Sequence, residues 1–353
     1  MLELQAAPVV DKTLECARQG RPYQEYRIPG VVVTAKGTLL CCYEARKALM
    51  NDWAPIDLKI RRSADEGESW SEYVIDHTVV EPLYGEVTFN NPVLLAEGAT
   101  IHLLFCQNYE RAYHCVSRDD GQSWSTPRDI TAVFDGFDVP WNVCAVGPGH
   151  GIATREGRLI VPIWIANGAP LDETGRVKDH QPSRAGAIWS DDHGETWHAG
   201  GLFDGFVNAN ETCVAQTLTG DLLFNIRHGG EEDLRGLAWS KDGAISYERS
   251  LLCSQLPDPR CFGGMAAMAD GTLAFVNCAH ARPSRRNLVV SLSEDEGETW
   301  RQALRVAEIA AYADMAAAPD GIWVFFEYRD GVNKYATHLI LRKYALKEVS
   351  ASQ

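Results

Sequence analysis

The sequence predicts an all-β fold built from repeated four-stranded antiparallel units, and two observations carry this prediction. Short apolar stretches alternate with polar turns that contain glycine. In residues 26–70, strand, turn, strand, loop, strand and turn follow one another in this way. The turn that ends this stretch, SADEGESW at residues 63–70, also recurs along the chain with the form S-x-D-x-G-x-x-W. A turn repeated at this spacing indicates a β-propeller.

The recurring turn is complete in four copies and altered in a fifth. The complete copies begin at Ser63, Ser117, Ser190 and Ser293, and the altered copy begins at Ser240. In such a turn the Ser and Asp side chains accept backbone N–H bonds, Gly takes a positive φ angle, and the aromatic residue anchors the turn to its sheet. The copies start roughly 50–70 residues apart, about the length of one blade with its loops. Each motif residue has a structural task, so we expect no catalytic role for the motif aspartates.

Composition limits the classes of protein to which the chain can belong. Its 353 residues, 45% of them hydrophobic, can bury one large core, and the repeat leaves no room for a second domain, so we expect one domain over residues 1–353. A formal net charge of −15 argues against a nucleic-acid partner, because an acidic protein repels phosphate backbones. Ten cysteines without a C-x-x-C pair or zinc spacing predict buried, reduced thiols.

The sequence also contains no pattern typical of secretion or membrane insertion. No basic region followed by an apolar core opens it, and no apolar run approaches the length of a membrane span. We therefore expect a cytoplasmic protein without a membrane partner. The sequence indicates no particular oligomeric state.

The recurring turns are Asp boxes, and the chain resembles the sialidases (neuraminidases) of the Asp-box (BNR) repeat type. The resemblance implies a six-bladed β-propeller with four-stranded antiparallel blades and Asp-box turns. Propellers usually close by pairing the two chain ends, so a strand within residues 8–14 is expected to pair with the alternating strand 337–344. Asp boxes also occur in propellers that are not sialidases, so they predict the fold and leave the function to other residues.

In the first blade, residues 26–77, the resemblance assigns roles to three residues that pattern alone would leave as surface or turn residues. Arg27 lies in the run R-I-P before a buried strand and matches the first of three arginines that bind the substrate carboxylate in the family. Asp52, in the loop ALMNDWAP, matches the acid/base aspartate. Arg46, in the run E-A-R, is expected to contact substrate hydroxyls or to form a structural ion pair.

The second and third blades contain no chemically specific pattern. The run F-N-N-P at residues 89–92 begins a strand. The run G-P-G-H-G at residues 147–151 resembles a family loop beside the site, whereas pattern alone predicts a plain tight turn. It is not a phosphate-binding loop, because no helix follows it.

The fourth and fifth blades supply further candidates. The run N-E-T at Glu211, followed by a strand that ends in N-x-R at Arg227, matches the family's catalytic glutamate and its second carboxylate-binding arginine. In the fifth blade, alignment of Asn287 with the family pattern R-x-N/D selects Arg285 as the third arginine, with Arg286 as the alternative.

The sixth blade resembles the family run G-Y-S…D-G…L-Y-E in its spacing. Tyr312 falls on the nucleophile, and Glu327 falls on the glutamate that orients Arg27. The sequence departs from the family pattern at Ala311 and Ala313, where the family has Gly and Ser.

Together these residues fit the hydrolysis of a glycoside whose anomeric carbon bears a carboxylate. Guanidinium groups bind carboxylates through paired hydrogen bonds. A neutral tyrosine avoids the repulsion that an Asp or Glu nucleophile would meet at such a carbon, and Glu211 would act as its base. Asp52 would protonate the leaving oxygen and then activate water. The resemblance thus implies a retaining exo-α-sialidase that releases terminal sialic acid from glycoconjugates, with no metal or organic cofactor.

Three alternatives stay open at the level of the sequence. The substrate could be another 2-keto-3-deoxy sugar acid, since only the pocket for the N-acyl group discriminates, and Met50 and Trp53 are merely candidate walls for it. The chain could be a non-catalytic sialoglycan-binding propeller, although a pure binder needs only the arginines. The same residue types also allow a trans-sialidase or an intramolecular lyase.

Overall fold

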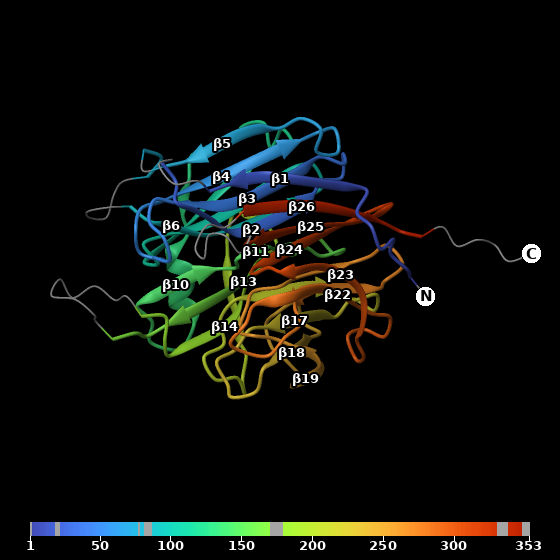
Figure 1. The fold of residues 1–353 in the computed structure, drawn as a ribbon. Helices are drawn as coiled ribbons and strands as arrows, with labels where there is room; N and C mark the ends of the chain where they lie inside the picture. Colours follow the sequence, from blue (N-terminus) through green and yellow to red (C-terminus); the bar gives the residue numbers. More distant parts are fainter. Residues whose placement is uncertain are drawn as a thin grey trace, which may run out of the picture.

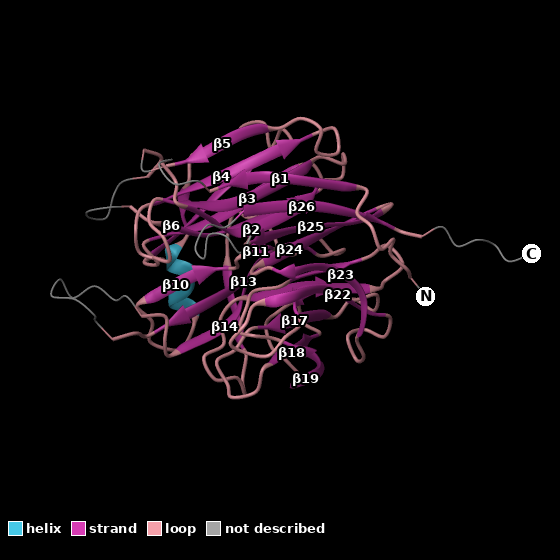
Figure 2. Cartoon of the chain, viewed as in Figure 1, coloured by secondary structure: helices cyan, strands magenta, loops and turns pink. Residues whose placement is uncertain are grey.

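The structure is a computed structural model that describes residues 2–17, 22–76, 78–80, 87–169, 179–329 and 338–347. It is almost entirely β-structure, with six small sheets arranged as the blades of a propeller, which confirms the predicted fold class (Figure 1, Figure 2). The described residues contain one short 3-10 helix, η1 (Thr131–Gly136). In this part of the chain no helix has the length and apolarity that a bilayer span requires.

In the first five blades the strands follow one another along the chain from the axis to the rim. The first blade contains β2 (Glu25–Val33), β3 (Leu39–Arg46), β4 (Ile56–Ser63) and β5 (Ser71–Ile75). The second contains β6 (Phe89–Glu97), β7 (Thr100–Gln107), β8 (Arg111–Ser117) and β9 (Arg128–Asp129). The third contains β10 (Val143–Val146), β13 (Leu159–Ala166), β14 (Ser183–Ser190) and β15 (His198–Leu202), with β12 (Ile152–Ala153) paired to β13.

The remaining blades follow the same plan. The fourth contains β16 (Thr212–Gln216), β17 (Leu222–Ile226), β18 (Leu234–Ser240) and β19 (Arg249–Pro257). The fifth contains β20 (Gly264–Ala267), β21 (Leu273–Cys278), β22 (Arg286–Ser293) and β23 (Arg301–Ile309). The sixth contains β24 (Ala313–Ala318), β25 (Gly321–Tyr328), β26 (His338–Ala345) and β1 (Val10–Cys16).

Burial explains why the second strands are the most apolar segments of the sequence. Strands β3 and β13 are buried along their whole length, because neighbouring blades cover both of their faces. They consequently appear as continuous apolar runs instead of alternating ones. The rim strand β5 is mostly exposed, and its sequence is correspondingly polar.

The two ends of the chain close the ring, as the sequence predicts. Strand β1 is antiparallel to β26, with Val10 opposite Lys343 and Cys16 opposite His338. Figure 1 shows the dark blue β1 beside the red β26. The sixth blade therefore takes its rim strand from the N-terminal segment, and its strands cannot separate from the first blade without breaking this pairing.

The run G-P-G-H-G at residues 147–151 is more than the plain tight turn that pattern alone predicts. It contains β11 (Gly149–His150), which leaves the third blade and pairs in parallel with β6 of the second. An added Cβ at Gly149 would lie 2.6 Å from Phe262 Cζ, and its φ is +90°. Glycine is required here because the backbone passes through the crowded axis in a left-handed conformation.

The Asp boxes connect the third and fourth strands of the first five blades, and their internal bonds are those expected. In the first box, the amide of Gly67 donates to Ser63 Oγ at 2.8 Å, and the amide of Ser69 donates to Asp65 Oδ1 at 2.9 Å. Hydrogen bonds from Ser69 hold the pKa of Asp65 at about 2. In the altered fifth copy the buried Ala244 occupies the glycine position, with φ +74°, and its amide still reaches Ser240 Oγ at 2.9 Å.

Each box also packs against the second strand of the preceding blade. A Cβ added to a box glycine would contact a side chain of that strand. Gly67 faces Trp323 of β25 and Gly121 faces Leu40 of β3, while Gly194 faces His102 of β7 and Gly297 faces Leu223 of β17. In the altered box, Arg158, directly before β13, donates to the carbonyl oxygen of Gly243 at 3.2 Å. The boxes therefore join neighbouring blades as well as closing their own turns, which explains why this motif repeats while the loops around it vary.

This packing predicts a difference between two glycine substitutions. Gly297→Ala places a methyl group 2.3 Å from Leu223 Cδ2 at a φ of +87°. Gly157→Ala has a similar φ of +93° but meets nothing within 4 Å, so it isolates the backbone cost of about 1 kcal/mol. We expect Gly297→Ala to lower the free energy of unfolding by a further ~1–3 kcal/mol, measured by urea unfolding. Equal losses would show that the box glycine has only a conformational task.

Candidate active site

The blades enclose a cavity of about 800 Å³ at one end of the axis. The first residues of the inner strands and the last residues of the second strands meet there, because the paired strands are antiparallel. Of the eight site residues predicted from the sequence, Glu327 is buried behind the wall and bonded to Arg27. The others line the cavity: Arg27, Arg46, Asp52, Glu211, Arg227, Arg285 and Tyr312.

Tyr312 lies at the centre of this site, directly before β24. Its phenol donates to Glu211 Oε1 at 2.6 Å and accepts from Arg227 Nη1 at 2.6 Å, and Arg227 forms an ion pair with Glu211. Burial raises the pKa of Tyr312 above its ordinary value, although the nearby arginines act in the opposite direction. The protein therefore holds a neutral phenol whose proton already points to a carboxylate.

Three guanidinium groups surround the ring of Tyr312. The Cζ atoms of Arg27 and Arg285 lie 5.1 Å from the ring centroid, and that of Arg227 lies 5.9 Å away. Arg285 is half-buried and donates to the carbonyl oxygen of Arg260 at 3.0 Å, whereas Arg286 is exposed at the cavity mouth. The predicted third arginine, Arg285, thus lies beside Tyr312, and the alternative, Arg286, lies at the edge of the cavity.

A bulge in β2 aims Arg27 into the cavity. Ile28 has a φ of +61°, which is strained for a β-branched residue, and the pairing register with β3 shifts between Arg27 and Gly30. The freed amide of Ile28 donates to Glu327 Oε1 at 3.0 Å, and Arg27 Nε donates to the same oxygen at 3.1 Å. The other oxygen of Glu327 accepts from the amide of Tyr312 at 3.4 Å. Glu327 thus fixes the first arginine relative to the tyrosine.

The same arrangement occurs one blade further on. Asn91 has a φ of +52° in a bulge of β6, and its amide donates to Glu44 Oε1 at 2.9 Å. Glu44 is fully buried on β3, as Glu327 is on β25, but it pairs at 2.6 Å with Arg46 of its own strand, whereas Glu327 pairs with Arg27 of the next blade. A buried carboxylate that accepts from a bulged amide therefore joins the first blade to the second, and the same kind of contact joins the sixth blade to the first.

Asp52 lines the cavity beside Arg46, and 41% of its side chain is exposed. Its Oδ1 accepts from Arg46 Nη1 at 2.6 Å. Partial burial raises the pKa of Asp52, but Arg46 and Arg27 outweigh this effect and lower the pKa to about 2. Arg46 thus forms the structural ion pairs that were one of its two predicted roles, and it helps to hold Asp52 as a carboxylate.

An aromatic wall flanks Asp52. The rings of Tyr109, Trp164 and His180 line the cavity, and Trp53 lies behind them with its ring 4.7 Å from Tyr109 and 5.1 Å from His180. Among the described residues, Trp164 Nε1 and His180 Nε2 are buried without a hydrogen-bond partner. Burial lowers the pKa of His180, so this wall is uncharged near neutral pH.

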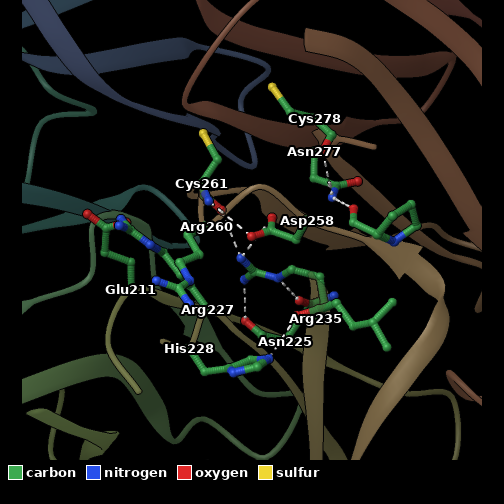
Figure 3. A network of polar contacts seen from close by, with 12 residues as sticks. Glu211, Asn225, Arg227, His228, Arg235, Asp258, Arg260, Cys261, Asn277 and Cys278 are labelled. Atoms are coloured by element: carbon green, nitrogen blue, oxygen red, sulfur yellow. Dashed lines mark hydrogen bonds and ion pairs between the residues drawn. The ribbon is translucent and has the colours of Figure 1, made fainter. Parts of the chain in front are cut away.

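A buried network of polar contacts centred on Arg235 lies beside Arg227 (Figure 3). Arg235 has no exposed surface and donates to Asn225 Oδ1 at 2.6 Å and to the carbonyl oxygen of Cys261 at 2.9 Å. Asn225 lies two residues before Arg227 on the same chain segment, and Cys261 follows Arg260, whose carbonyl accepts from Arg285. Arg235 therefore fixes the backbone that carries Arg227 and the backbone that receives Arg285.

Several functional residues were not identified from the sequence: Glu44, Asn91, Tyr109, Trp164, His180 and Arg235. One signal for two of them is present in the sequence. The run E-x-R occurs at residues 44–46 and 327–329, and x-x-P occurs at residues 27–29 and 90–92. Comparison of the blades with one another would have paired Glu44 with Glu327 and Asn91 with Ile28. The aromatic wall has no such signal, because its rings come from three separate segments.

Comparison with known proteins gives a family match over most of the chain. The profile of the family described as "BNR repeat-like domain" matches residues 37–324. A curated sialidase from Micromonospora viridifaciens is 28% identical over 356 aligned residues, which cover 90% of this chain and 52% of that protein. Sialidase-3 from Bos taurus is 27% identical, over 66% of this chain and 59% of its own length. The chain spans about half the length of the curated relatives it matches.

Solved structures share the fold. The structure named "Hadza microbial sialidase Hz136" has a TM-score of 0.75 and 24% identity, and the match covers 91% of this chain and 66% of that one. A Trypanosoma rangeli sialidase, solved with a difluoro derivative of 2-keto-3-deoxynononic acid, has a TM-score of 0.74 and 16% identity over 96% of this chain and 58% of its own. These likenesses extend the fold assignment to nearly the whole chain.

The pairing of Arg27 with Glu327 predicts a strong coupling in stability. Glu327→Gln leaves the guanidinium of Arg27 without its carboxylate, and we expect a loss of about 3 kcal/mol in the free energy of unfolding. The double variant with Arg27→Met should lose less than the sum of the single variants, measured by denaturant unfolding.

A matched control is the exposed pair of Arg249 and Glu298 on the rim, where Glu298→Gln should change stability by less than ~1 kcal/mol. Additive losses for the Arg27 and Glu327 variants would contradict a direct interaction between them.

Proposed function

Since the chain belongs to the family of BNR repeat-like domain proteins, we propose that it is a retaining exo-α-sialidase, a glycoside hydrolase that releases terminal sialic acid from glycoconjugates. The single observation that carries the proposal is the environment of Tyr312. Its phenol lies between Glu211 and Arg227, and three guanidinium groups surround its ring. A tyrosine in contact with a base and enclosed by cations suits attack on a carbon that bears a carboxylate.

Arg27, Arg227 and Arg285 would bind the carboxylate of the substrate. Glu327 and Glu211 already pair with the first two, whereas Arg285 reaches only a carbonyl oxygen among the described residues. Arg285 therefore supplies the cation that a substrate anion would neutralise. With a net charge of −15, the protein as a whole repels anions, so this local cluster selects the position at which one binds.

In the first step the oxygen of Tyr312 would bond to the anomeric carbon while the bond to the leaving oxygen breaks. The proton of the phenol passes to Glu211, to which it already points at 2.6 Å. Burial keeps the phenol neutral until this transfer, so it approaches the substrate carboxylate without charge repulsion. Arg227, bonded to the same oxygen, stabilises the negative charge that develops on it.

Asp52 would give a proton to the leaving oxygen and later accept one from the attacking water, which returns the anomeric carbon to its first configuration. A pKa of about 2 makes Asp52 a carboxylate in the empty site. Binding of the substrate carboxylate to Arg27 reduces the positive field that lowers this pKa. We infer that substrate binding raises the pKa of Asp52 and so promotes its protonation before the first step.

The substrate class is argued from the aromatic wall and from the relatives. The T. rangeli sialidase has been solved with 2,3-difluorosialic acid as a covalent intermediate and with the difluoro derivative of 2-keto-3-deoxynononic acid. In this chain Tyr109, Trp164 and His180 form an uncharged wall beside Asp52 with two unpaired buried nitrogens. Such a wall suits an N-acyl group. Its methyl group can pack on the rings, and its amide can form hydrogen bonds with Trp164 Nε1 and His180 Nε2. The wall therefore favours sialic acid over the deaminated sugar acid.

The proposal predicts that Tyr312→Phe abolishes turnover. The ring stays in its packing while the nucleophilic oxygen is lost, so we expect kcat for an aryl sialoside to fall by about 10³-fold or more, measured by release of the aryl alcohol. Tyr247→Phe, in the altered Asp box, is the matched control and should keep full activity.

A Tyr312→Phe variant as active as the parent would contradict the mechanism. NMR of the first product should show free sialic acid with its α configuration retained. Formation of an anhydro sugar, or transfer without hydrolysis, would assign the site to an intramolecular lyase or a trans-sialidase instead.

The two neighbouring arginines give a second test. Arg285→Met removes one charge-assisted contact to the substrate carboxylate, and we expect KM to rise about 10- to 100-fold. Arg286→Met changes an exposed side chain of the same type and should alter KM by less than about threefold. A larger effect at Arg286 than at Arg285 would reverse the assignment of the third arginine.

A further inference from the structure

A buried ion pair lies on the propeller axis below the proposed active site, and the mechanism does not use it. His150 Nδ1, on β11, lies 2.9 Å from Asp314 Oδ1 and 3.0 Å from Asp314 Oδ2, on β24. Asp314 has no exposed surface, and His150 is 8% exposed. His150 lines a second cavity of about 310 Å³, at the far ends of the inner strands, which gives this imidazole a route for proton exchange.

The ring of His150 is directed at a carboxylate. Its Nδ1 lies within hydrogen-bond distance of both oxygens of Asp314, which is the geometry of a buried ion pair when the imidazole is protonated. Burial lowers the pKa of His150, but Asp314 and the main chain of Met265, on β20, outweigh this effect and raise the pKa above its ordinary value. The contact with Asp314 and the raised pKa both favour an imidazolium.

Other titratable groups near the pair do not replace this charge. Arg155, across the second cavity, donates to the carbonyl oxygen of Thr217. On the strands packed near Asp314, the nearby titratable groups are the thiols of Cys41, Cys42 and Cys213, and burial raises their pKa values, so they remain neutral. Among the described residues on these elements, His150 is the cation that compensates Asp314.

Asp314 in turn joins the strand of the nucleophile to the strand of the first arginine. It lies two residues after Tyr312, and its Oδ2 accepts from the amide of Val31 on β2 at 2.9 Å. The carboxylate fits against Gly264, where an added Cβ would lie 2.1 Å from Asp314 Oδ1. The carboxylate has no room to turn, so its Oδ2 stays directed at the amide of Val31 while Oδ1 and Oδ2 face His150.

We propose that His150 is a positioning residue for the reaction: as an imidazolium it fixes Asp314 on the axis, and Asp314 holds β24 with Tyr312 against β2 with Arg27. The effect of His150 on catalysis rests on the proposed function. The assignment of a positive charge to His150 is independent of that function. Because the cation forms only when His150 is protonated, its contribution is present at low pH. It is lost as the pH rises through the raised pKa of His150.

The charge is tested by NMR on protein labelled with ¹⁵N in histidine, with the His150 signals assigned by their loss in His150→Asn. At about pH 6.5, where an ordinary histidine is half protonated, most His150 side chains should be protonated on both ring nitrogens. Asp314→Asn removes the compensating charge and should return His150 to the neutral form. One unprotonated ring nitrogen in the parent protein at this pH would overturn the proposal.

The positioning role is tested by the pH dependence of kcat for an aryl sialoside. His150→Asn should lower kcat by about tenfold or more, change KM by less than about threefold, and remove an alkaline decline that the parent shows. His198→Asn, an exposed histidine on β15, is the control and should keep the parental profile. A role in stability alone would lower the melting temperature and leave the shape of the profile unchanged.

The two proposals fail in different ways. A charged His150 in a protein that hydrolyses no sialoside would refute the proposed function and leave the charge assignment standing. An active His150→Asn variant with an unaltered pH profile would refute the positioning role and leave the proposed function standing.

Discussion

Glu327 is a carboxylate without any exposed surface, and three donors from two blades converge on it. Two of them, the side chain of Arg27 and the amide of Ile28, belong to the first blade, and the third, the amide of Tyr312, belongs to the sixth. The contact therefore crosses the seam at which the ring closes. The pairing of β1 with β26 completes the sixth blade, so the geometry of the site depends on the two ends of the chain being joined. The site can therefore assemble only when the ring of blades is closed.

The same contact recurs in a form without the nucleophile. Glu44 accepts from the bulged amide of Asn91, as Glu327 accepts from the bulged amide of Ile28, although Glu44 pairs with an arginine of its own strand and Glu327 with one of the next blade. A propeller repeats its backbone, so the carboxylates near the ends of β3 and β25 each lie beside a bulge in the inner strand of the following blade. The site uses two copies of this contact for different purposes. One copy aims an arginine at the proposed carboxylate position, and the other holds the arginine that lowers the pKa of Asp52.

The sequence was informative where a residue's task is set by its own turn or strand. The Asp boxes predicted the blades because Ser, Asp and Gly act within a single turn, and the spacing of the boxes then gave the ring. The eight predicted residues do gather at one cavity, although their catalytic roles remain predictions. The contacts between blades were not predictable in this way. Glu44 and Asn91 become meaningful only when two blades are superposed, and His150 only when β11 is seen to cross the axis. These partners are far apart in the chain, so no local sequence pattern predicts their contact.

The charges of the site bear on how a group as acidic as Asp52 would act as the acid that we propose. Four arginines, at positions 27, 46, 227 and 285, are accompanied by four carboxylates, at positions 44, 52, 211 and 327. With every group ionised these charges sum to zero, but Glu44 and Asp52 share Arg46, and Arg285 has no carboxylate among the described residues. A substrate carboxylate bound to Arg285 would therefore leave the pair of Glu44 and Asp52 one cation short. An uncompensated negative charge is costly in a medium of low dielectric, and the least buried carboxylate, Asp52, is the one best placed to take up a proton to offset it. Binding of the anion would thus raise the pKa of Asp52 from about 2 and favour its protonation.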